Sequence, residues 1–349
     1  MASPVVLGID TSNYRTSLCL LDEQGEVRLD KRQWLTVAQG ERGLKQADAV
    51  FQHLRQLPEL VQEEELDGYD IRAVAVSTKP RPLKGSYMPV FTVGTAFAQW
   101  LSSFRSIPLY RTTHQEGHIW AALRQHPQLI DRDLWVLHLS GGTSDVLDVR
   151  FVGKRLEIAT IGGSRDLHVG QLVDRVGVAL GLPFPAGAEL ERLARTVDSE
   201  EGEQPSAAAL SLPSSVVGSW FSFSGPEAAA MRLIEEGAAA ARVARAVERC
   251  IAATLEKVLR HLSRLESGRP ILLVGGVAGN RWIRQRLSTR WRKGADRLFF
   301  TPPRFSGDNA CGIAYWGLQM LADSIEGESN GQENRWQGSG CPDPRRDPR

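Results

Sequence analysis

Cysteine is scarce in this 349-residue sequence, and the cysteines that occur are not paired. Cys19, Cys250, Cys311 and Cys341 are far apart, and no two of them form a C-x-x-C motif. Such motifs mark zinc ribbons and thiol redox centres, and dense cysteine marks small disulfide-stabilised domains. The sequence therefore argues against these classes and favours a chain that folds in a reducing cytoplasm.

An excess of charge of one sign is also missing. The chain has 42 Lys and Arg against 41 Asp and Glu, which gives a formal net charge of +1. Proteins that attract nucleic-acid phosphates over their whole surface carry a clear excess of basic residues. Any contact with RNA must therefore be local or assisted by a partner protein.

Long apolar runs are absent as well. No segment approaches the roughly 20 apolar residues of a membrane span. Residues 1–10 lack the basic region and long apolar stretch of a secretion signal. We therefore expect neither export nor insertion into a membrane, and a cytoplasmic location.

A repeated pattern of strands is present in the chain, which is long enough for two domains. Each copy consists of a strand, a short loop and two further strands. This duplication predicts two similar halves that face one another across a cleft, although two unrelated meanders would give the same pattern. The copies comprise residues 5–10, 16–21 and 26–35, and residues 134–139, 146–151 and 156–161.

Further strands and helices are expected between and after the two copies, which predicts a mixed α/β core. The strand candidates are residues 71–77, 107–110, 270–274 and 298–301, and the helix candidates are 88–104, 169–180, 238–265, 281–291 and 309–321. The Ala- and Ser-rich residues 199–215 are expected to form a surface excursion. From residue 326 the chain is polar and rich in Gly and Pro, which predicts disorder.

Two histidines four residues apart indicate a metal site. Thr113 and Glu116 form a capping-box pattern that predicts the start of a helix, so His114 and His118 would lie on one face of it. Two imidazoles and a carboxylate are a donor set for zinc or iron. Without a third ligand, two structural histidines are an equal alternative. A zinc-peptidase site needs Glu after the first His, where this chain has Gln115.

Three loops that follow predicted strands could bind phosphate or nucleotide through backbone N–H groups and small hydroxyls. Residues 10–13 and 140–143 occupy the same place in the two copies, although each alone could be an ordinary turn. In residues 275–280, two glycines join a strand to a helix and would let the backbone approach a ligand closely. A tight strand-to-helix turn is the alternative there. We expect a nucleotide to be the ligand.

The order of these motifs resembles that of the TsaD family over residues 5–320. The corresponding segments are Gly8-Ile9-Asp10-Thr11-Ser12, His114-Gln115-Glu116-Gly117-His118, Ser140-Gly141-Gly142, Phe221-Ser222-Phe223-Ser224-Gly225, Gly275-Gly276-Val277 with Asn280-Arg281, and Asp308-Asn309. The resemblance implies the actin-like (ASKHA) fold, with two similar α/β domains facing each other across a nucleotide-binding cleft. The implied domains are 1–112 and 113–308, followed by a helix at 309–324 that packs on the first domain and a disordered tail at 325–349.

The resemblance also implies the ligands of this site. One divalent metal, iron or zinc, would be held by His114, His118 and Asp308. The adenine nucleotide would be held by Leu139, Ser140, Gly141, Gly142, Thr143, Asp174, Gly187, Gly275, Gly276 and Asn280. Asp174 would accept ribose hydroxyls, although a solvated position on the outer face of a helix would suit it too.

The reaction implied by the resemblance moves a threonylcarbamoyl group from threonylcarbamoyl-adenylate to N6 of the tRNA adenosine next to the anticodon. The tRNA would be bound through a complex with TsaB-like and TsaE-like subunits. The adenine amine is a poor nucleophile, and a metal that polarises the carbonyl would answer this difficulty. No catalytic side chain is assigned, because the reaction needs no nucleophilic Cys or Ser.

The sequence departs from the family pattern within several of these motifs. Asn13-Tyr14-Arg15 stands where the family has Cys-Asp-Glu, so a phenol and a cation replace two carboxylates. The Gly-Pro-Gly loop reads Pro80-Arg81-Pro82, and Thr143, Leu167 and Gln171 replace a His, an Asp and a Glu. Two further hypotheses therefore stay open. One is a related carbamoyl or acyl transferase with a different acceptor, and the other is a non-catalytic nucleotide-binding subunit.

Overall fold

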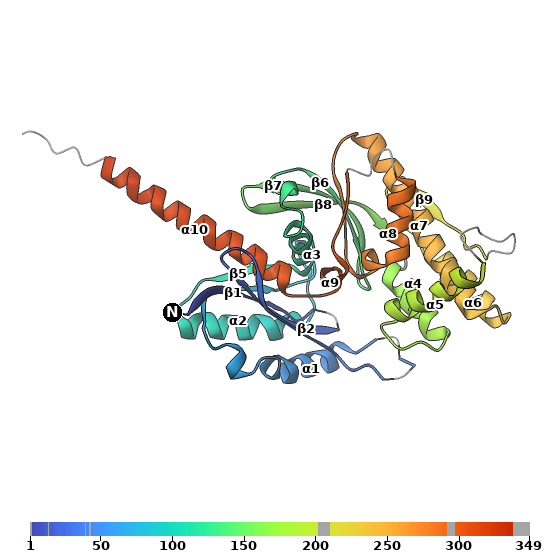
Figure 1. Ribbon diagram of the computed structural model, residues 1–349, viewed down its shortest axis with the longest axis horizontal. Helices are drawn as coiled ribbons and strands as arrows, with labels where there is room; N and C mark the ends of the chain where they lie inside the picture. Colours follow the sequence, from blue (N-terminus) through green and yellow to red (C-terminus); the bar gives the residue numbers. More distant parts are fainter. Residues whose placement is uncertain are drawn as a thin grey trace, which may run out of the picture.

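The computed structural model describes residues 2–12, 14–38, 40–41, 43–201, 210–291 and 297–337, with side chains described for all of these except 198–201 and 325–337. Two β-sheets form the centre of the molecule, and helices pack against both (Figure 1). The predicted α/β fold class is thereby confirmed. The domain limits 1–112 and 113–308 stay predictions.

One face of the first sheet is covered by two helices, α1 (Gln46–Glu59) and α2 (Phe91–Arg105). It contains β1 (Ser3–Asp10), β2 (Arg15–Asp22), β3 (Val27–Trp34), β4 (Tyr69–Ser77) and β5 (Leu109–Thr112), in the order β3-β2-β1-β4-β5. The first three strands form the predicted antiparallel meander, and β4 and β5 run parallel to β1. Val74 and Val76 are fully buried in one cluster with Leu57 of α1 and Val93 of α2. This burial explains the continuous apolar sequence of β4.

The second sheet repeats this arrangement and extends it. Its strands are β6 (Leu134–Leu139), β7 (Ser144–Val152), β8 (Arg155–Ser164), β9 (Ser215–Val217), β10 (Trp220–Ser222), β11 (Ile271–Val274) and β12 (Leu298–Phe300). The order β8-β7-β6-β11-β12 matches β3-β2-β1-β4-β5 with the same parallel and antiparallel pairings, and β10 and β9 continue beyond β8. The two predicted meanders are therefore copies of one topology, and the loops after β1 and β6 occupy equivalent places.

The second half carries most of the helices. They are α3 (His114–Leu123), α4 (Val169–Ala179), α5 (Gly187–Glu201), α6 (Ser224–Glu235), α7 (Ala240–Leu265), α8 (Arg281–Arg290) and α9 (Pro303–Ser306). The sequence predicts α4, α7 and α8 but misses α5, α6 and, in the first half, α1. Leu190, Ala194 and Val197 recur at helical spacing in α5 and bury one face, with α7 as its main neighbour. No helix of the described residues is long and apolar enough to cross a membrane.

Helix α10 (Cys311–Gln337) returns from the second half and packs across the first sheet and α3. Two glycines allow this close packing. A Cβ on Gly312 would overlap the carbonyl oxygen of Gly117, and a Cβ on Gly317 would lie 2.6 Å from the Cβ of Ala75.

The end of α10 differs from the expected boundary. The sequence pattern predicts a helix that ends at 321, and the family resemblance implies an end at 324, whereas the helix continues to Gln337 and projects away from the body of the molecule (Figure 1). No proline interrupts the chain between Cys311 and Gln337, so nothing in the backbone forces the earlier end. Residues 338–349 of the expected tail lie outside the described residues.

Candidate metal and nucleotide site

Helix α3 places the two histidines of the predicted metal site on one face. The predicted capping box is present: Thr113 Oγ1 accepts a hydrogen bond from the N–H of Glu116 (3.2 Å), and the Glu116 carboxylate accepts one from the N–H of Thr113 (2.9 Å). His114 and His118 are both buried, and their Nε2 atoms lie 3.1 Å apart. The spacing of four residues thus brings two donors to one point.

Asp308 joins the pair from the segment before α10. Its Oδ1 lies 3.4 Å from the Nε2 of His114 and 3.4 Å from the Nε2 of His118. A tetrahedral ion with bonds of about 2.0–2.1 Å holds its donors about 3.3 Å apart. The three observed separations fit such an ion, and the three residues form a group able to hold one. The donors predicted from distant parts of the chain are therefore brought together.

Asp10, the last residue of β1, fixes the orientation of His114. Its Oδ2 lies 3.0 Å from Nδ1 of His114, and the Ser12 hydroxyl donates to the same oxygen (2.8 Å). The hydroxyl of Ser77 donates to the other oxygen. A proton on Nδ1 leaves Nε2 free for a metal. The sequence gives Asp10 no such role, because its partner lies 104 residues further along the chain.

The charges of this cluster depend on one another. Burial would lower the pKa of His114, but the carboxylates of Asp10 and Asp308 outweigh burial and raise that pKa to about 10. Burial and the His114 cation lower the pKa of His118. Burial would raise the pKa of Asp308, but hydrogen bonds from both histidines hold it well below its usual range. With its raised pKa, His114 is an imidazolium between the carboxylates of Asp10 and Asp308. A bound metal would supply positive charge in its place.

Further polar residues surround the cluster. The ring of His138 lies against His118 with centroids 4.8 Å apart, and its buried Nε2 has no hydrogen-bond partner within the described part of the chain. The Gln115 side chain donates a hydrogen bond to the Asp145 carboxylate (3.2 Å). Because Gln115 is an amide, it cannot serve as the base of a peptidase. Arg81 reaches the same carboxylate from the first half (3.3 Å). The sequence does not identify His138 or Asp145, because neither belongs to a recognisable spacing.

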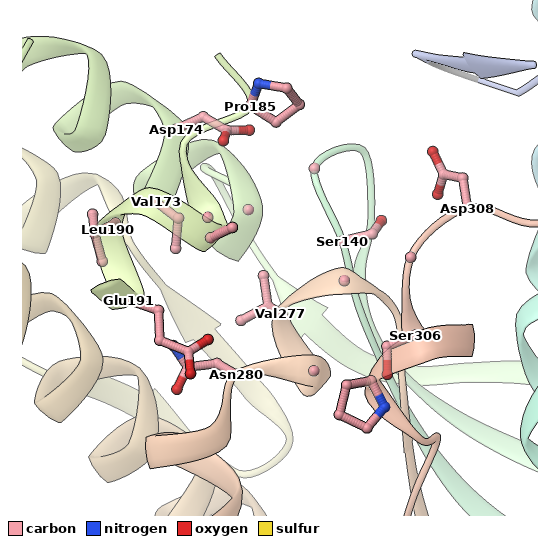
Figure 2. Close-up of a pocket in the computed structure, with 18 of the residues that line it drawn as sticks. Ser140, Val173, Asp174, Pro185, Leu190, Glu191, Val277, Asn280, Ser306 and Asp308 are labelled. Carbon is pink, nitrogen blue, oxygen red and sulfur yellow. The ribbon is translucent and has the colours of Figure 1, made fainter. Parts of the chain in front are cut away.

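A cavity of about 410 Å³ lies between the two halves, next to this cluster. Asp308 lines it, so the cavity and the metal cluster share a residue. In Figure 2, Asp174, Glu191 and Asn280 lie on one side of the Ser140 loop, and Asp308 lies on the other. Seven of the ten predicted nucleotide residues also line the cavity: Ser140, Gly141, Gly142, Asp174, Gly187, Gly276 and Asn280.

The other three predicted nucleotide residues are not among those that line the cavity. Leu139 and Thr143 are buried, and the Thr143 hydroxyl accepts a long hydrogen bond from Arg81 (3.5 Å). Gly275 has φ +93°, and a Cβ there would overlap the carbonyl oxygen of Leu139. At Gly276, a Cβ would meet open space. The close backbone approach predicted for this loop is therefore between Gly275 and β6. Gly276 is the glycine of this pair that lines the cavity.

Asp174 and Asn280 face the cavity with different freedom. Asp174 accepts a hydrogen bond from the N–H of Ala186 (2.8 Å), and burial raises its pKa to about 6 despite this bond. Asn280 caps α8 by accepting from the N–H of Ile283 (2.9 Å), and its amide donates to Glu248 (2.6 Å). Asn280 is thus a structural residue as well, whereas one carboxylate oxygen of Asp174 has no hydrogen-bond partner among the described residues.

The first half contributes Tyr14, Arg15 and Trp34 to the cavity wall. The hydroxyls of the first loop do not reach this wall, in contrast to the symmetric arrangement that the sequence predicts. Residues 10–12 are fully buried, and their side chains form hydrogen bonds within the protein. Tyr14 meets Phe184 of the second half edge to face, with ring centroids 4.9 Å apart. The wall is therefore aromatic and cationic.

Solved structures with the same fold define the class of protein. The chain superposes on HypF in its phosphate- and nucleotide-bound form with a TM-score of 0.54, at 14% identity and covering 93% of this chain and 47% of that one. An activator of the 2-hydroxyisocaproyl-CoA dehydratase from Clostridium difficile with bound ADPNP gives a TM-score of 0.52 at 14% identity, with coverage of 92% and 97%. Together with the duplicated sheets, these likenesses show an actin-like fold.

Sequence comparison narrows this class to one family. The family model of TsaD, tRNA N6-adenosine threonylcarbamoyltransferase, matches residues 44–315 of the sequence. A Thermus thermophilus protein of that name is 32% identical over 317 residues, which cover 88% of this chain and 90% of the relative. A probable bifunctional tRNA threonylcarbamoyladenosine biosynthesis protein from Thermoplasma acidophilum is 25% identical over 325 residues, with coverage of 92% and 57%. The chain therefore belongs to the TsaD family of transferases, as its motifs predict.

Proposed function

We propose that this protein transfers the threonylcarbamoyl group of threonylcarbamoyl-adenylate to N6 of the tRNA adenosine next to the anticodon, in a metal-dependent reaction. Family membership supports the reaction class. The observation that carries the metal dependence is the position of Asp308, which belongs to the three-donor cluster and also lines the cavity. A reacting carbonyl in the cavity would therefore lie beside the metal.

The donor set suits the chemistry that such a transfer requires. A metal held by His114, His118 and Asp308 would act as a Lewis acid on the carbonyl that the adenine amine attacks. The chain itself binds and orients the leaving adenylate. The N–H of Ser140 bonds to the Thr143 oxygen, so the N–H groups of Gly141 and Gly142 would face the phosphate, and Asp174 would accept hydrogen bonds from the ribose. The residues do not distinguish iron from zinc, because nitrogen and oxygen donors suit both.

The near-neutral net charge and one exposed apolar surface support the participation of partner proteins. Trp100 and Phe104 of α2 stack with ring centroids 5.3 Å apart and are 64% and 73% exposed. Phe51 and Leu54 of the neighbouring α1 are also exposed. Exposed apolar groups of this size are typical of protein contacts. They support a TsaB-like partner on this face, with TsaE-like and tRNA contacts in a cytoplasmic complex.

Mass spectrometry of tRNA nucleosides tests the function directly. Cells in which this protein is the sole TsaD-like gene product should contain threonylcarbamoyladenosine, and His118→Ala should abolish it. His261→Ala, on α7, removes a histidine that does not line the cavity and should leave the modification intact. Absence of the nucleoside with the unaltered protein, when partner proteins are present, would refute the proposal.

A second candidate is transfer of a carbamoyl or acyl group to a different acceptor. Tyr14 and Arg15 favour it, because they line the cavity at positions where the family has carboxylates. Consumption of threonylcarbamoyl-adenylate without modified tRNA would support this candidate. Nucleotide binding without any consumption would instead indicate a non-catalytic subunit.

A further inference from the structure

Arg15 places a cation in the wall of the cavity. Its Nη1 donates to the backbone oxygen of Asp308 (3.2 Å), and its guanidinium carbon lies 3.7 Å from the ring centroid of Trp34. Within the described part of the chain it forms no ion pair. Arg32, on the adjacent strand, differs, because its guanidinium is paired with the Asp30 carboxylate. A guanidinium has five N–H donors, so most donors of Arg15 are unused by the described residues.

Arg15 lies at one end of the cavity. Its bond to Asp308 places it at the metal end, whereas Asp174 and Asn280 lie on the other side of the Ser140 loop (Figure 2). An adenylate with its ribose at Asp174 and its phosphate at the loop would direct its acyl group toward Asp308. Arg15 would then lie next to the acyl group and not next to the base.

We infer that Arg15 and Trp34 form a carboxylate-binding subsite that selects acyl-adenylates whose acyl group carries a carboxylate. The inference rests on the proposed function, in which the acyl group derives from an amino acid. The Trp34 ring contacts the guanidinium, and the planar fork of a guanidinium matches the two oxygens of a carboxylate. An acyl group without a carboxylate, such as a plain carbamoyl group, gains nothing from this subsite.

The charge of the neighbouring Asp308 explains why a cation is needed there. A ligand carboxylate at the metal end would be repelled by the Asp308 carboxylate, and Arg15 offsets this repulsion. A metal bound to Asp308 would neutralise part of its negative charge. The positive charge of Arg15 would then be balanced by even less negative charge within the protein. An anionic acyl group would supply that compensation.

Isothermal titration with three probes tests the subsite: AMP, a non-hydrolysable threonylcarbamoyl-adenylate analogue, and the same analogue with the carboxylate replaced by a carboxamide. Arg15→Gln should weaken binding of the carboxylate analogue by roughly tenfold to a hundredfold, the usual range for a lost charged hydrogen bond. Binding of AMP and of the carboxamide should change less than about threefold. Arg15→Lys should be intermediate, because it keeps the charge and loses the fork.

Arg32→Gln is the matched control, since it removes a nearby positive charge that does not line the cavity. It should leave all three affinities unchanged. An equal loss for AMP and the carboxylate analogue in Arg15→Gln would overturn the inference and assign Arg15 to the phosphate. Unaltered affinities in both Arg15 variants would overturn it as well. If the unaltered protein binds AMP but not the carboxylate analogue, the proposed function fails together with the inference. If it binds the analogue and the Arg15 variants bind it equally well, the inference alone fails.

Discussion

The loops after β1 and β6 occupy equivalent places in the two halves, yet their central residues differ in exposure. Asp10, Thr11 and Ser12 of the first loop are fully buried, and Asp10 holds His114. Gly141 and Gly142 of the second loop are exposed and line the cavity. The duplicated topology has therefore not duplicated the role. The first loop supports the cluster of His114, His118 and Asp308, and the second exposes its backbone to the cavity.

The largest expected effect separates the metal from the nucleotide. His118→Ala should lose most of the bound metal, because two remaining donors hold an ion poorly. The rise in melting temperature with adenine nucleotide should persist, since the second loop is unchanged. Elemental analysis and thermal melts measure the two quantities. If His118→Ala lost both the metal and the nucleotide-induced melting shift, the proposed separation of a metal role and a nucleotide role between the two loops would be wrong.

The converse substitution is Gly276→Val. Its side chain would enter the open space at this position and fill part of the cavity, so the melting shift with nucleotide should disappear while metal content stays constant. Gly225→Val, at a position that also has open space but does not line the cavity, is the control. An undiminished shift in Gly276→Val would mean that the nucleotide binds elsewhere.

Asp10→Asn tests the supporting role of the first loop. Removal of a carboxylate that orients a metal-bound histidine typically lowers metal affinity by about 10–100-fold. We expect a loss of that size in competition with a chelator. Asp22→Asn alters another buried aspartate, which is paired with Arg28, and should leave metal affinity unchanged. Equal affinities of Asp10→Asn and the unaltered protein would remove Asp10 from the site.

The pH dependence of nucleotide binding should report Asp174. Burial raises its pKa to about 6, above the usual 3.8, so folding stability from this group falls as the pH rises from about 4 to 6. The ionised carboxylate is the better acceptor for ribose hydroxyls, so nucleotide affinity should increase over the same range. Titrations at several pH values should show this increase, and Asp174→Asn should abolish it. A pH-independent affinity in the unaltered protein would contradict the ribose role.

The smallest effect is expected for Asn280→Ala. Loss of the cap of α8 should lower the free energy of unfolding by about 1 kcal/mol, and nucleotide binding should weaken less than in Gly276→Val. Chemical denaturation with and without nucleotide separates these contributions. A complete loss of the nucleotide-induced shift would show that Asn280 is a principal ligand contact.

Sequence patterns predict the repeated strands well, because period and turn residues are local properties. They also predict α3 and its two histidines, since the capping box and the four-residue spacing lie within one segment. Asp308 comes from family resemblance alone, as nothing local links it to α3. Asp10 and His138 are missed because their neighbours are set by tertiary packing of β1 and β6 against α3.

The predicted nucleotide loops illustrate a different limit. A double glycine predicts close backbone packing at residues 275–276, but it does not reveal what is packed. At Gly275 the neighbour is the backbone of Leu139, and at Gly276 it is the cavity. Likewise, equal topology predicts equal loops, and only side-chain burial shows that the first loop is closed.

The tight contact between α10 and α3 has a mechanical consequence. With Gly312 against Gly117, the two helix backbones already touch, so they act as a fixed pivot if the halves move apart. Atoms near a pivot travel least. His114 is the first residue of α3, and Asp308 lies in the segment just before α10. Under the proposed function, we expect the acceptor to enter by separation of the Tyr14 and Phe184 side chains while the donor geometry is preserved. Hydrogen exchange should then be slow in α3 and fast near Phe184, and equal rates would count against such a pivot.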